Sequence, residues 1–234
     1  MTGILTPTRR RGVEILDDPL IDPDVMRRSM EDVERANTLF GGKRAAIEEL
    51  KLVFPRTGSA ASLLDVGTGR GDIPSAAAKV ARTMGIELRT LGLDISEPLL
   101  PAGAARIGSV VRGDALRLPF ATGSVDIVLA SQILHHFQAE EATLFIRELD
   151  RVARFAVVIS DLRRSRLAAA GLWLGSFPLG FHPVSRHDGV VSVMRGFIAA
   201  ELSQLVDAAI GARPEVRRRL GFRLTTHWNK KQSR

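Results

Sequence analysis

Short, almost continuously apolar runs alternate with longer amphipathic stretches through the middle of the chain. The runs lie near 62–66, 89–93, 108–111, 125–130 and 155–160. Such runs are typical of strands buried on both faces of a parallel sheet, and the stretches between them are typical of amphipathic helices. The alternation therefore predicts an α/β fold whose parallel strands are joined by right-handed helical crossovers.

The region before the first run is polar and amphipathic. Asp22 and Pro23 offer a helix cap and a first helical position, and apolar residues then recur at helical spacing. The glycine pair that begins at Gly41 interrupts this spacing, which resumes after it. We expect two or more helices here, forming an N-terminal helical cap over residues 1–55.

The region after the fifth run combines an apolar helical segment with a final pair of strands. We expect residues 163–205 to form a helical lid, inserted into a main domain that spans 56–234. Two further strand segments near 215–220 and 222–228 meet at Gly221, a residue type that suits a tight turn. Together with the five earlier runs, they make a seven-stranded sheet.

The first run ends in a carboxylate and three alternating glycines. The ten residues from Leu63 read LLDVGTGRGD. Glycine tolerates positive φ and lets a ligand lie against bare backbone. Asp72 stands where the dinucleotide fingerprint needs its third glycine, and the carboxylate of Asp65 would repel a pyrophosphate. Asp65 suits a cation better, and S-adenosylmethionine (SAM) carries both an ammonium and a sulfonium group.

Several segments, spread over about residues 60–162, resemble the motifs of the class I SAM-dependent methyltransferases. The glycine segment is similar to their first motif, and Asp94 to the acid that binds the ribose. Asp114 resembles the residue that meets the adenine amine, and LPFATGSVDIV from Leu118 is similar to the lead-in to strand four. The stretch SQILHHF from Ser131 resembles the ubiquinone/menaquinone-biosynthesis-like, small-molecule branch.

This resemblance implies a Rossmann-like, seven-stranded class I methyltransferase sheet with N-terminal helices, and SAM as cofactor. The residues that it implies for cofactor binding are Asp65, Gly67, Thr68, Gly69, Gly71, Asp94, Ile95, Asp114, Ala115 and Ser131.

A general base is the catalytic group to look for, because methyl transfer to a hydroxyl needs positioning and removal of a proton. His187, in a polar segment over 184–189 that we interpret as a loop, is the first candidate, since an imidazole can take a phenolic proton at neutral pH. His136 after the fourth strand and Asp161 at the end of the fifth are the alternatives. We expect His187→Ala to lower turnover by at least about 100-fold with SAM affinity intact, and we expect no metal.

The acceptor is expected to be small and apolar or aromatic. The apolar run over 167–181 is too short to span a bilayer, so it is either a buried core helix or the wall of an acceptor pocket. The wall residues would be Leu172, Trp173, Phe177 and Phe181. A weak contact with a membrane surface beside neighbouring arginines is a third interpretation. O-methylation of a phenolic or enolic hydroxyl is favoured, with C-methylation of an activated ring as an alternative.

Composition narrows the remaining alternatives. The chain has no cysteine, which excludes disulfides, thiolate zinc sites and a cysteine nucleophile. The net charge of +7 raises a nucleic-acid-directed enzyme as a further alternative, and many of the cations lie near the C-terminus. They are Arg213, Arg217, Arg218, Arg219, Arg223, Lys230, Lys231 and Arg234. Tyrosine is absent and the other aromatic residues are scattered, so a base-stacking surface is not indicated and nucleic acid is disfavoured. The first ten residues lack the apolar core of a signal peptide, so a cytoplasmic protein is expected.

Overall fold

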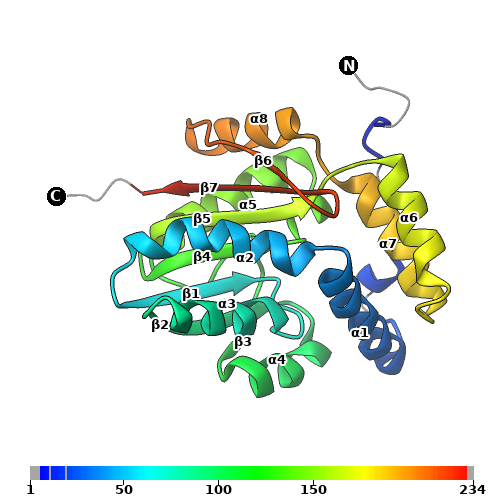
Figure 1. Ribbon diagram of the computed structural model, residues 1–234, viewed down its shortest axis with the longest axis horizontal. Coiled ribbons are helices and arrows are strands. Elements are labelled where there is room, and N and C mark those ends of the chain that lie inside the picture. Colours follow the sequence, from blue (N-terminus) through cyan, green and yellow to red (C-terminus); the bar gives the residue numbers. More distant parts are fainter. Residues whose placement is uncertain (1–5, 11, 19, 231–234) are drawn as a thin grey trace.

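A seven-stranded sheet forms the centre of the molecule (Figure 1). The computed structural model describes residues 6–10, 12–18 and 20–230. The strands are β1 Ala60–Val66, β2 Glu87–Asp94, β3 Val110–Arg112, β4 Val125–Ser131, β5 Ala153–Leu162, β6 Arg217–Arg219 and β7 Arg223–Asn229. Their order is β3-β2-β1-β4-β5-β7-β6; β7 pairs antiparallel with β5 and with β6, and the other pairs are parallel. The predicted α/β fold and seven-stranded sheet are confirmed.

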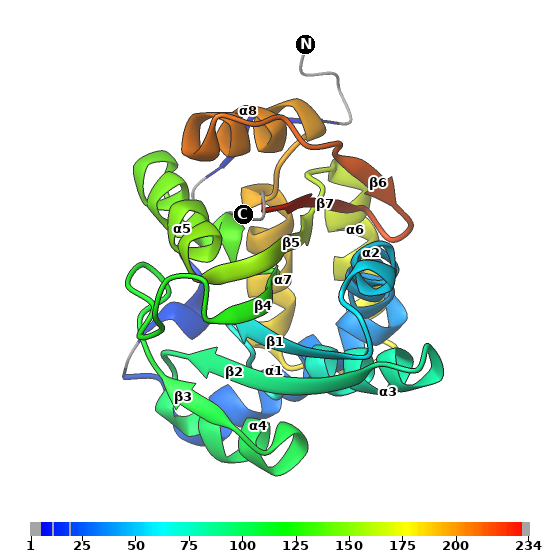
Figure 2. The ribbon, with the colours of Figure 1, turned by 90° about the vertical axis from the view of Figure 1, so that its left-hand side faces the viewer.

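Helices cover both faces of the sheet, as Figure 2 shows edge-on. The α-helices of the described chain are α1 Pro23–Leu39, α2 Gly42–Val53, α3 Asp72–Thr83, α4 Leu100–Ile107, α5 Ala139–Val152, α6 Arg166–Ser176, α7 Pro183–Arg195 and α8 Ala199–Ile210. The apolar faces of α2 and α3 pack against β1, β4 and β5 on one side, and α5 and α8 build the larger apolar cluster on the other. These two layers hold the strand ends in place.

The N-terminal helices form where the sequence predicts them. The Asp22 side chain caps α1 by accepting hydrogen bonds from the backbone N–H groups of Asp24 and Val25. Gly41 adopts a left-handed conformation with φ of 79° and separates α1 from α2. Because α2 buries Leu50 against the sheet, this helix belongs to the packing of the main domain. The boundary at residue 55 stays a prediction.

Three helices gather where β1, β4 and β5 end, at the right of Figure 1: α1, α6 and α7. The predicted loop over 184–189 is wrong, because these residues lie inside α7. Pro183 takes the first helical position, where its missing N–H costs nothing, and the His182 side chain accepts from the Val184 N–H. In the described part of the chain, no helix is both long and apolar enough to cross a membrane.

Candidate active site

A cavity of about 930 Å³ lies at the carboxyl ends of the central strands, where open α/β folds bind their ligands. Its walls come from α1, from the segments that follow β2, β3 and β4, from α6 and α7, and from the turn between β6 and β7. A smaller cavity of about 100 Å³ lies against the glycine loop. Gly67 and Gln132 line both cavities, so they mark the junction between the two.

The loop after β1 turns sharply under the cavity. Its glycines have positive φ: 73° at Gly67, 52° at Gly69 and 70° at Gly71. A Cβ at Gly67 would lie 2.6 Å from Cδ1 of Ile133, so a larger residue here would be strained by the positive φ and would have to displace the Ile133 side chain. The N–H of Gly69 donates to Oδ2 of Asp94 at 2.8 Å, which ties the loop to the end of β2.

Asp65 is a buried carboxylate with an unused oxygen. The residue is 2% exposed; its Oδ2 accepts from the Thr68 hydroxyl at 2.9 Å, and its Oδ1 has no hydrogen-bond partner among the described residues. Burial raises the pKa of Asp65 to about 8, and the nearby charges of Asp72 and Asp94 add to this shift. Asp65, Thr68 and Asp72 line the smaller cavity, so the oxygen atoms of its wall suit a cation.

Asp94 and Asp114, which are expected to contact the ribose and adenine of SAM, line the larger cavity. Oδ1 of Asp94 accepts from the Ser96 N–H at 2.9 Å, and Oδ1 of Asp114 accepts from the Leu116 N–H at 2.9 Å. Burial raises the pKa of Asp94 above its usual value, although three backbone N–H groups oppose the shift.

Nine of the ten residues expected to bind the cofactor line one of the two cavities. Asp65, Thr68, Gly69 and Ser131 line the smaller one, Asp94, Ile95, Asp114 and Ala115 the larger, and Gly67 both. Gly71 lines neither, and it serves instead as the left-handed N-cap of α3. These residues fit SAM, because the unpartnered Asp65 oxygen and the buried, unpartnered Ser131 hydroxyl offer acceptors for an ammonium group.

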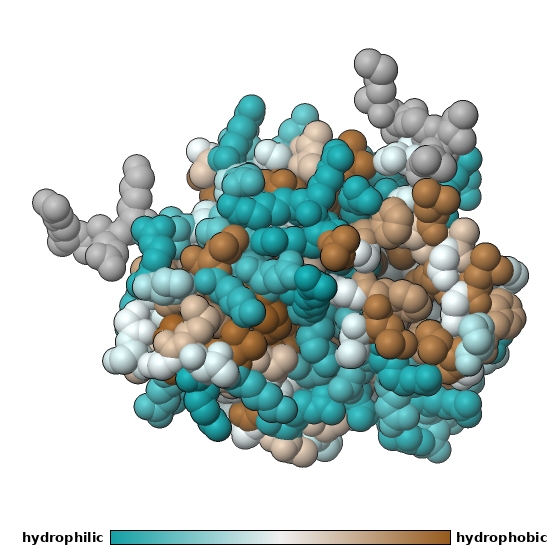
Figure 3. Space-filling model, viewed as in Figure 1, coloured by the Kyte–Doolittle hydropathy of each residue, from teal (hydrophilic) through white to brown (hydrophobic). Residues whose placement is uncertain are grey.

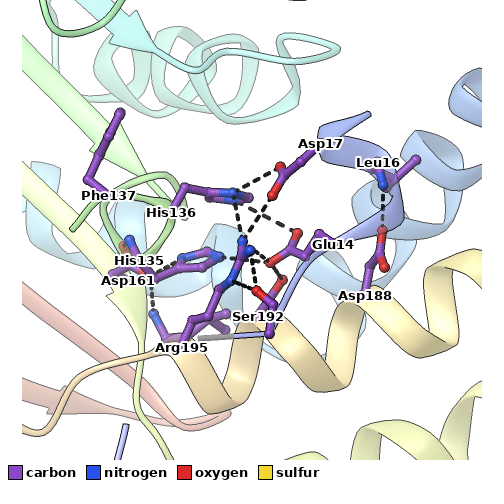
Figure 4. A network of polar contacts seen from close by, with 12 residues as sticks. Glu14, Leu16, Asp17, His135, His136, Phe137, Asp161, Asp188, Ser192 and Arg195 are labelled. Atoms are coloured by element: carbon purple, nitrogen blue, oxygen red, sulfur yellow. Dashed lines mark hydrogen bonds and ion pairs between the residues drawn. The ribbon is translucent and has the colours of Figure 1, made fainter. Parts of the chain in front are cut away.

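His135 and Asp161 form a buried pair beside the cavity (Figure 4). Nδ1 of His135 lies 2.7 Å from Oδ1 of Asp161, and the His135 backbone N–H donates to Oδ2 at 3.1 Å. Burial alone would raise the pKa of Asp161, but the charge and hydrogen bond of His135 outweigh it and lower this pKa below its usual value. Nε2 of His135 has no hydrogen-bond partner among the described residues, and the ring lines the larger cavity.

A second polar network connects His136 to the N-terminal segment. Nδ1 of His136 lies 3.3 Å from Asp17, and Nε2 lies 3.9 Å from Glu14. Burial opposes protonation of His136, but the hydrogen bond with Asp17 and the charges of Asp17 and Glu14 raise its pKa above the usual value. Arg195 donates to Glu14 at 3.0 Å and to Asp17 at 3.1 Å, so both acids have a cationic partner.

Glu14, His135 and His136 offer three ligand atoms within 4.8 Å of one another, a spacing that could hold a metal ion. The guanidinium of Arg195 stands against this use. It donates to Glu14, and its Nη1 lies 3.4 Å from Nδ1 of His136, so a metal ion would have to displace a cation. We interpret the cluster as an acid–base network.

The structure does not bring His187 into the cavity. It occupies the exposed face of α7 with 51% of its side chain accessible, and its Nδ1 lies 2.7 Å from Oδ1 of Asp188. The neighbouring Asp188 is buried, and it also accepts from the backbone N–H groups of Ile15 and Leu16 at 2.9 and 2.8 Å. Because these residues form a helix and not the expected loop, His187 does not line the larger cavity, and its role as a general base finds no support in this placement.

The sequence reasoning missed His135 as a catalytic candidate. A usable signal exists, because β4 and β5 are neighbouring parallel strands with Ser131 opposite Ser160. That register places residues just after β4 beside Asp161. No sequence signal points to Glu14 or Arg195, which meet over a separation of 181 residues.

Comparisons with known proteins agree with this geometry. Residues 64–156 match the family described as a methyltransferase domain. Over 98 residues, 39% of this chain and 32% of the relative, the chain is 34% identical to norajmaline N-methyltransferase of Rauvolfia serpentina. Over 118 residues, 47% of each protein, it is 33% identical to demethylmenaquinone methyltransferase of Roseiflexus sp. (strain RS-1). The chain carries a class I SAM-dependent methyltransferase domain.

A solved structure extends the likeness of this methyltransferase fold to most of the chain. Magnesium protoporphyrin IX methyltransferase from Synechocystis PCC 6803, crystallised with bound S-adenosylhomocysteine (SAH), superposes with a TM-score of 0.58 at 17% identity, covering 89% of this chain and 94% of that chain. The chain spans less than half the length of the curated relatives it matches. SAM is the cofactor of this class of domain, in accord with the carboxylates around the glycine loop.

Proposed function

We propose that this chain transfers the methyl group of SAM to the hydroxyl oxygen of a small phenolic or enolic acceptor, leaving a methyl ether and SAH. A cavity of about 930 Å³ is at the large end of the range for ligand sites and has room for an adenosine group and an aromatic acceptor. Beyond the end expected to bind the cofactor, it is walled by apolar residues of α1, of α6 and of the segment that joins α6 to α7. These include Met26, Met30, Leu167, Leu172 and Phe181.

The expected acceptor wall is present in part. Leu172 and Phe181 line the cavity, whereas Trp173 and Phe177 lie on the outer face of α6 and are each 48% exposed. Their rings contact each other edge to face, with centroids 4.9 Å apart. An apolar ring would therefore be held mainly by α1 and the inner face of the lid.

The His135–Asp161 pair is the observation that carries the proposal. Bound SAM supplies an electrophilic methyl group, so the protein has to hold the acceptor and remove its proton. Nε2 of His135 makes no hydrogen bond with the described residues and lies 4.0 Å from Oε1 of Glu14, so it can accept a hydroxyl proton. Asp161 fixes the ring through Nδ1, and both acids stabilise the imidazolium that results. His136 is the alternative base, because it lines the same cavity.

Turnover on a phenol series tests this assignment. We expect His135→Gln to lower turnover on 2-naphthol by about 10²- to 10⁴-fold, because general-base catalysis typically contributes that much. Asp161→Asn should also lower it. Both variants should bind SAM as the wild type does, and both should recover most activity on 4-nitrophenol at a pH where this phenol is already ionised.

His187→Ala is the matched control, because it removes an imidazole from the opposite face of α7. It should keep turnover within about threefold of the wild type, because His187 does not line the cavity and its neighbour Asp188 keeps the backbone N–H groups of Ile15 and Leu16 as donors. An equal loss on ionised and neutral phenols in His135→Gln would assign His135 a structural role only. A methyl group found on a ring carbon of the product would replace O-methylation by the C-methylation alternative.

The basic C-terminal segment supports a small-molecule acceptor over nucleic acid. Glu49 of α2 is fully buried and accepts from Arg217 at 2.9 Å and from Arg219 at 2.7 Å. Burial opposes its ionisation, but hydrogen bonds from His227 and these neighbours lower its pKa to about 2. Arg213 pairs with an aspartate of α8, and Lys230 pairs with one of α5. Lys231 and Arg234 lie outside the described residues. Arg217, Arg219 and Lys230 are largely covered and paired with the protein's own acids, so they are poorly placed to contact phosphates.

A weak contact with a membrane surface remains part of the proposal. Figure 3 shows apolar residues gathered over α6 at the right of the molecule. The exposed apolar side chains of this helix are Leu167, Trp173, Leu174 and Phe177. Co-sedimentation with anionic vesicles, compared between wild type and Trp173→Ala, measures this contact directly.

A further inference from the structure

Arg223 is a buried cation that faces the cavity without a carboxylate partner. The residue is 6% exposed, and the described residues place no carboxylate oxygen within 4.0 Å of its guanidinium. Its Nη1 donates to the carbonyl of Gly221 at 2.9 Å, and its Nε has no hydrogen-bond partner among these residues. Burial lowers the pKa of Arg223 to about 10, although the charge of Asp161 opposes the shift. The group stays cationic at neutral pH.

A buried charge of this kind is costly. Removing an ion from water costs several kcal/mol unless an opposite charge and hydrogen bonds compensate it. Other arginines of the same hairpin are compensated, since Arg217 and Arg219 both pair with Glu49. Arg223 differs from them in lining the larger cavity, where a ligand could provide the missing anion.

The backbone around Arg223 is held in an unusual conformation. Among the described residues, only Gln132 and Phe222 combine a side chain with positive φ, and both line the larger cavity. Such strain concentrates at functional sites. A Cβ placed on Gly42 would lie 3.3 Å from Nε of Arg223 and 3.1 Å from Nε2 of Gln132, so the two side chains flank this glycine. Arg223 is therefore close to the residue that marks the junction with the cofactor end.

We propose that Arg223 binds a carboxylate of the acceptor, so that the enzyme selects hydroxylated aromatic acids over neutral phenols. This inference rests on the proposed function and adds a specificity residue to it. The planar guanidinium offers parallel N–H donors that match the two oxygens of a carboxylate. The carboxylate of the cofactor is a less suitable partner, because Arg223 does not line the smaller cavity around Asp65, where the amino-acid end of SAM is expected.

Two ligands that differ by one carboxylate test the inference: 3-hydroxy-2-naphthoate and 2-naphthol. Their affinities are measured by calorimetry with SAH present, so that the result does not depend on turnover. We expect the wild type to bind the acid roughly 10- to 100-fold more tightly, the usual worth of a charge-assisted pair. Arg223→Gln should reduce this preference to threefold or less while 2-naphthol affinity stays the same.

Two further variants keep the test decisive. Arg223→Lys keeps the positive charge and should retain part of the preference, which also covers a folding defect in the glutamine variant. Arg218→Gln removes an exposed cation from the neighbouring strand and should change nothing. Equal wild-type affinity for the two ligands, or a preference that survives in Arg223→Gln, overturns the inference. Weaker SAM binding in Arg223→Gln with the preference intact also overturns it and assigns the guanidinium to the cofactor. Failure of the proposed function would appear separately, as wild-type protein that binds neither SAM nor SAH.

Discussion

Replacing Asp65 by asparagine should stabilise the cofactor-free protein in a pH-dependent manner. Burial raises the pKa of Asp65 to about 8 in the folded protein, against an ordinary value of 3.8. At a pH between 3.8 and about 8, the Asp65 carboxyl is ionised in the unfolded chain and protonated in the folded chain. Stability therefore falls as pH rises, by about 1.4 kcal/mol per pH unit, and the loss is complete above the folded pKa.

The effect on the free energy of unfolding is best measured as a difference between two pH values. From pH 5 to pH 7, the ionisation of Asp65 costs the wild type about 3 kcal/mol, and Asp65→Asn avoids this cost. The new amide leaves its own N–H groups short of acceptors, at a penalty of about 1–3 kcal/mol, but that penalty does not vary with pH and cancels in the comparison. The stability gap between variant and wild type should thus widen by about 3 kcal/mol.

Urea unfolding followed by circular dichroism at pH 5, 6 and 7, without SAM, measures this gap. The same variant should bind SAM roughly 10- to 100-fold more weakly, because it loses the partner of the ammonium group. A gap that stays constant from pH 5 to pH 7 would refute the buried, protonated carboxyl. Unchanged SAM affinity would show that the unpartnered oxygen does not face the ligand.

Two other substitutions probe the same cavity. Asp94→Ala should weaken SAM binding by roughly 10- to 100-fold, because the carboxylate is expected to hold the ribose hydroxyls, and calorimetry showing unchanged affinity would contradict that role. Asp188→Ala should lower the free energy of unfolding by about 1–3 kcal/mol, because the N–H groups of Ile15 and Leu16 lose their acceptor. It should also weaken acceptor binding with SAM affinity retained, and ligand titrations of the variant that match those of the wild type would argue against a role for the N-terminal segment in the site.

The grouping of the glycine loop with Asp65 and Asp94 at one end of the candidate site was predictable from the sequence because its signals are local. Asp65 and the alternating glycines follow one buried strand directly, and Asp94 ends the next. Parallel strands bring such residues to one edge of the sheet, whatever the details of side-chain packing. The same reasoning gave the strand positions, since a buried parallel strand is read from a few consecutive residues.

The acceptor end was predictable only in part, because it is assembled from distant segments. His187 stands in a polar stretch that resembles a loop, and only the packing of α7 on α1 and η1 (Ile15–Asp17) shows which side chains face inward. Arg195 donates a hydrogen bond to Glu14, and no local sequence pattern predicts this contact. The basic C-terminal segment was ambiguous for the same reason, since two of its cations, Arg217 and Arg219, find their partner in Glu49, on a helix near the other end of the chain.

The charges around the two cavities explain how one site can orient two ligands. Asp65, Asp72 and Asp94 place three carboxyl groups around the glycine loop. A cationic cofactor favours their ionised forms, including that of Asp65, whereas a pyrophosphate on the same backbone is disfavoured. Arg223 provides positive charge in the larger cavity, beyond Gln132. An acceptor with an anionic end and an apolar ring gains most by placing its anion at Arg223, which leaves its hydroxyl to be aligned between His135 and the cofactor. Because burial strengthens these fields, the polarity of the cavity itself can set the direction in which an acceptor enters.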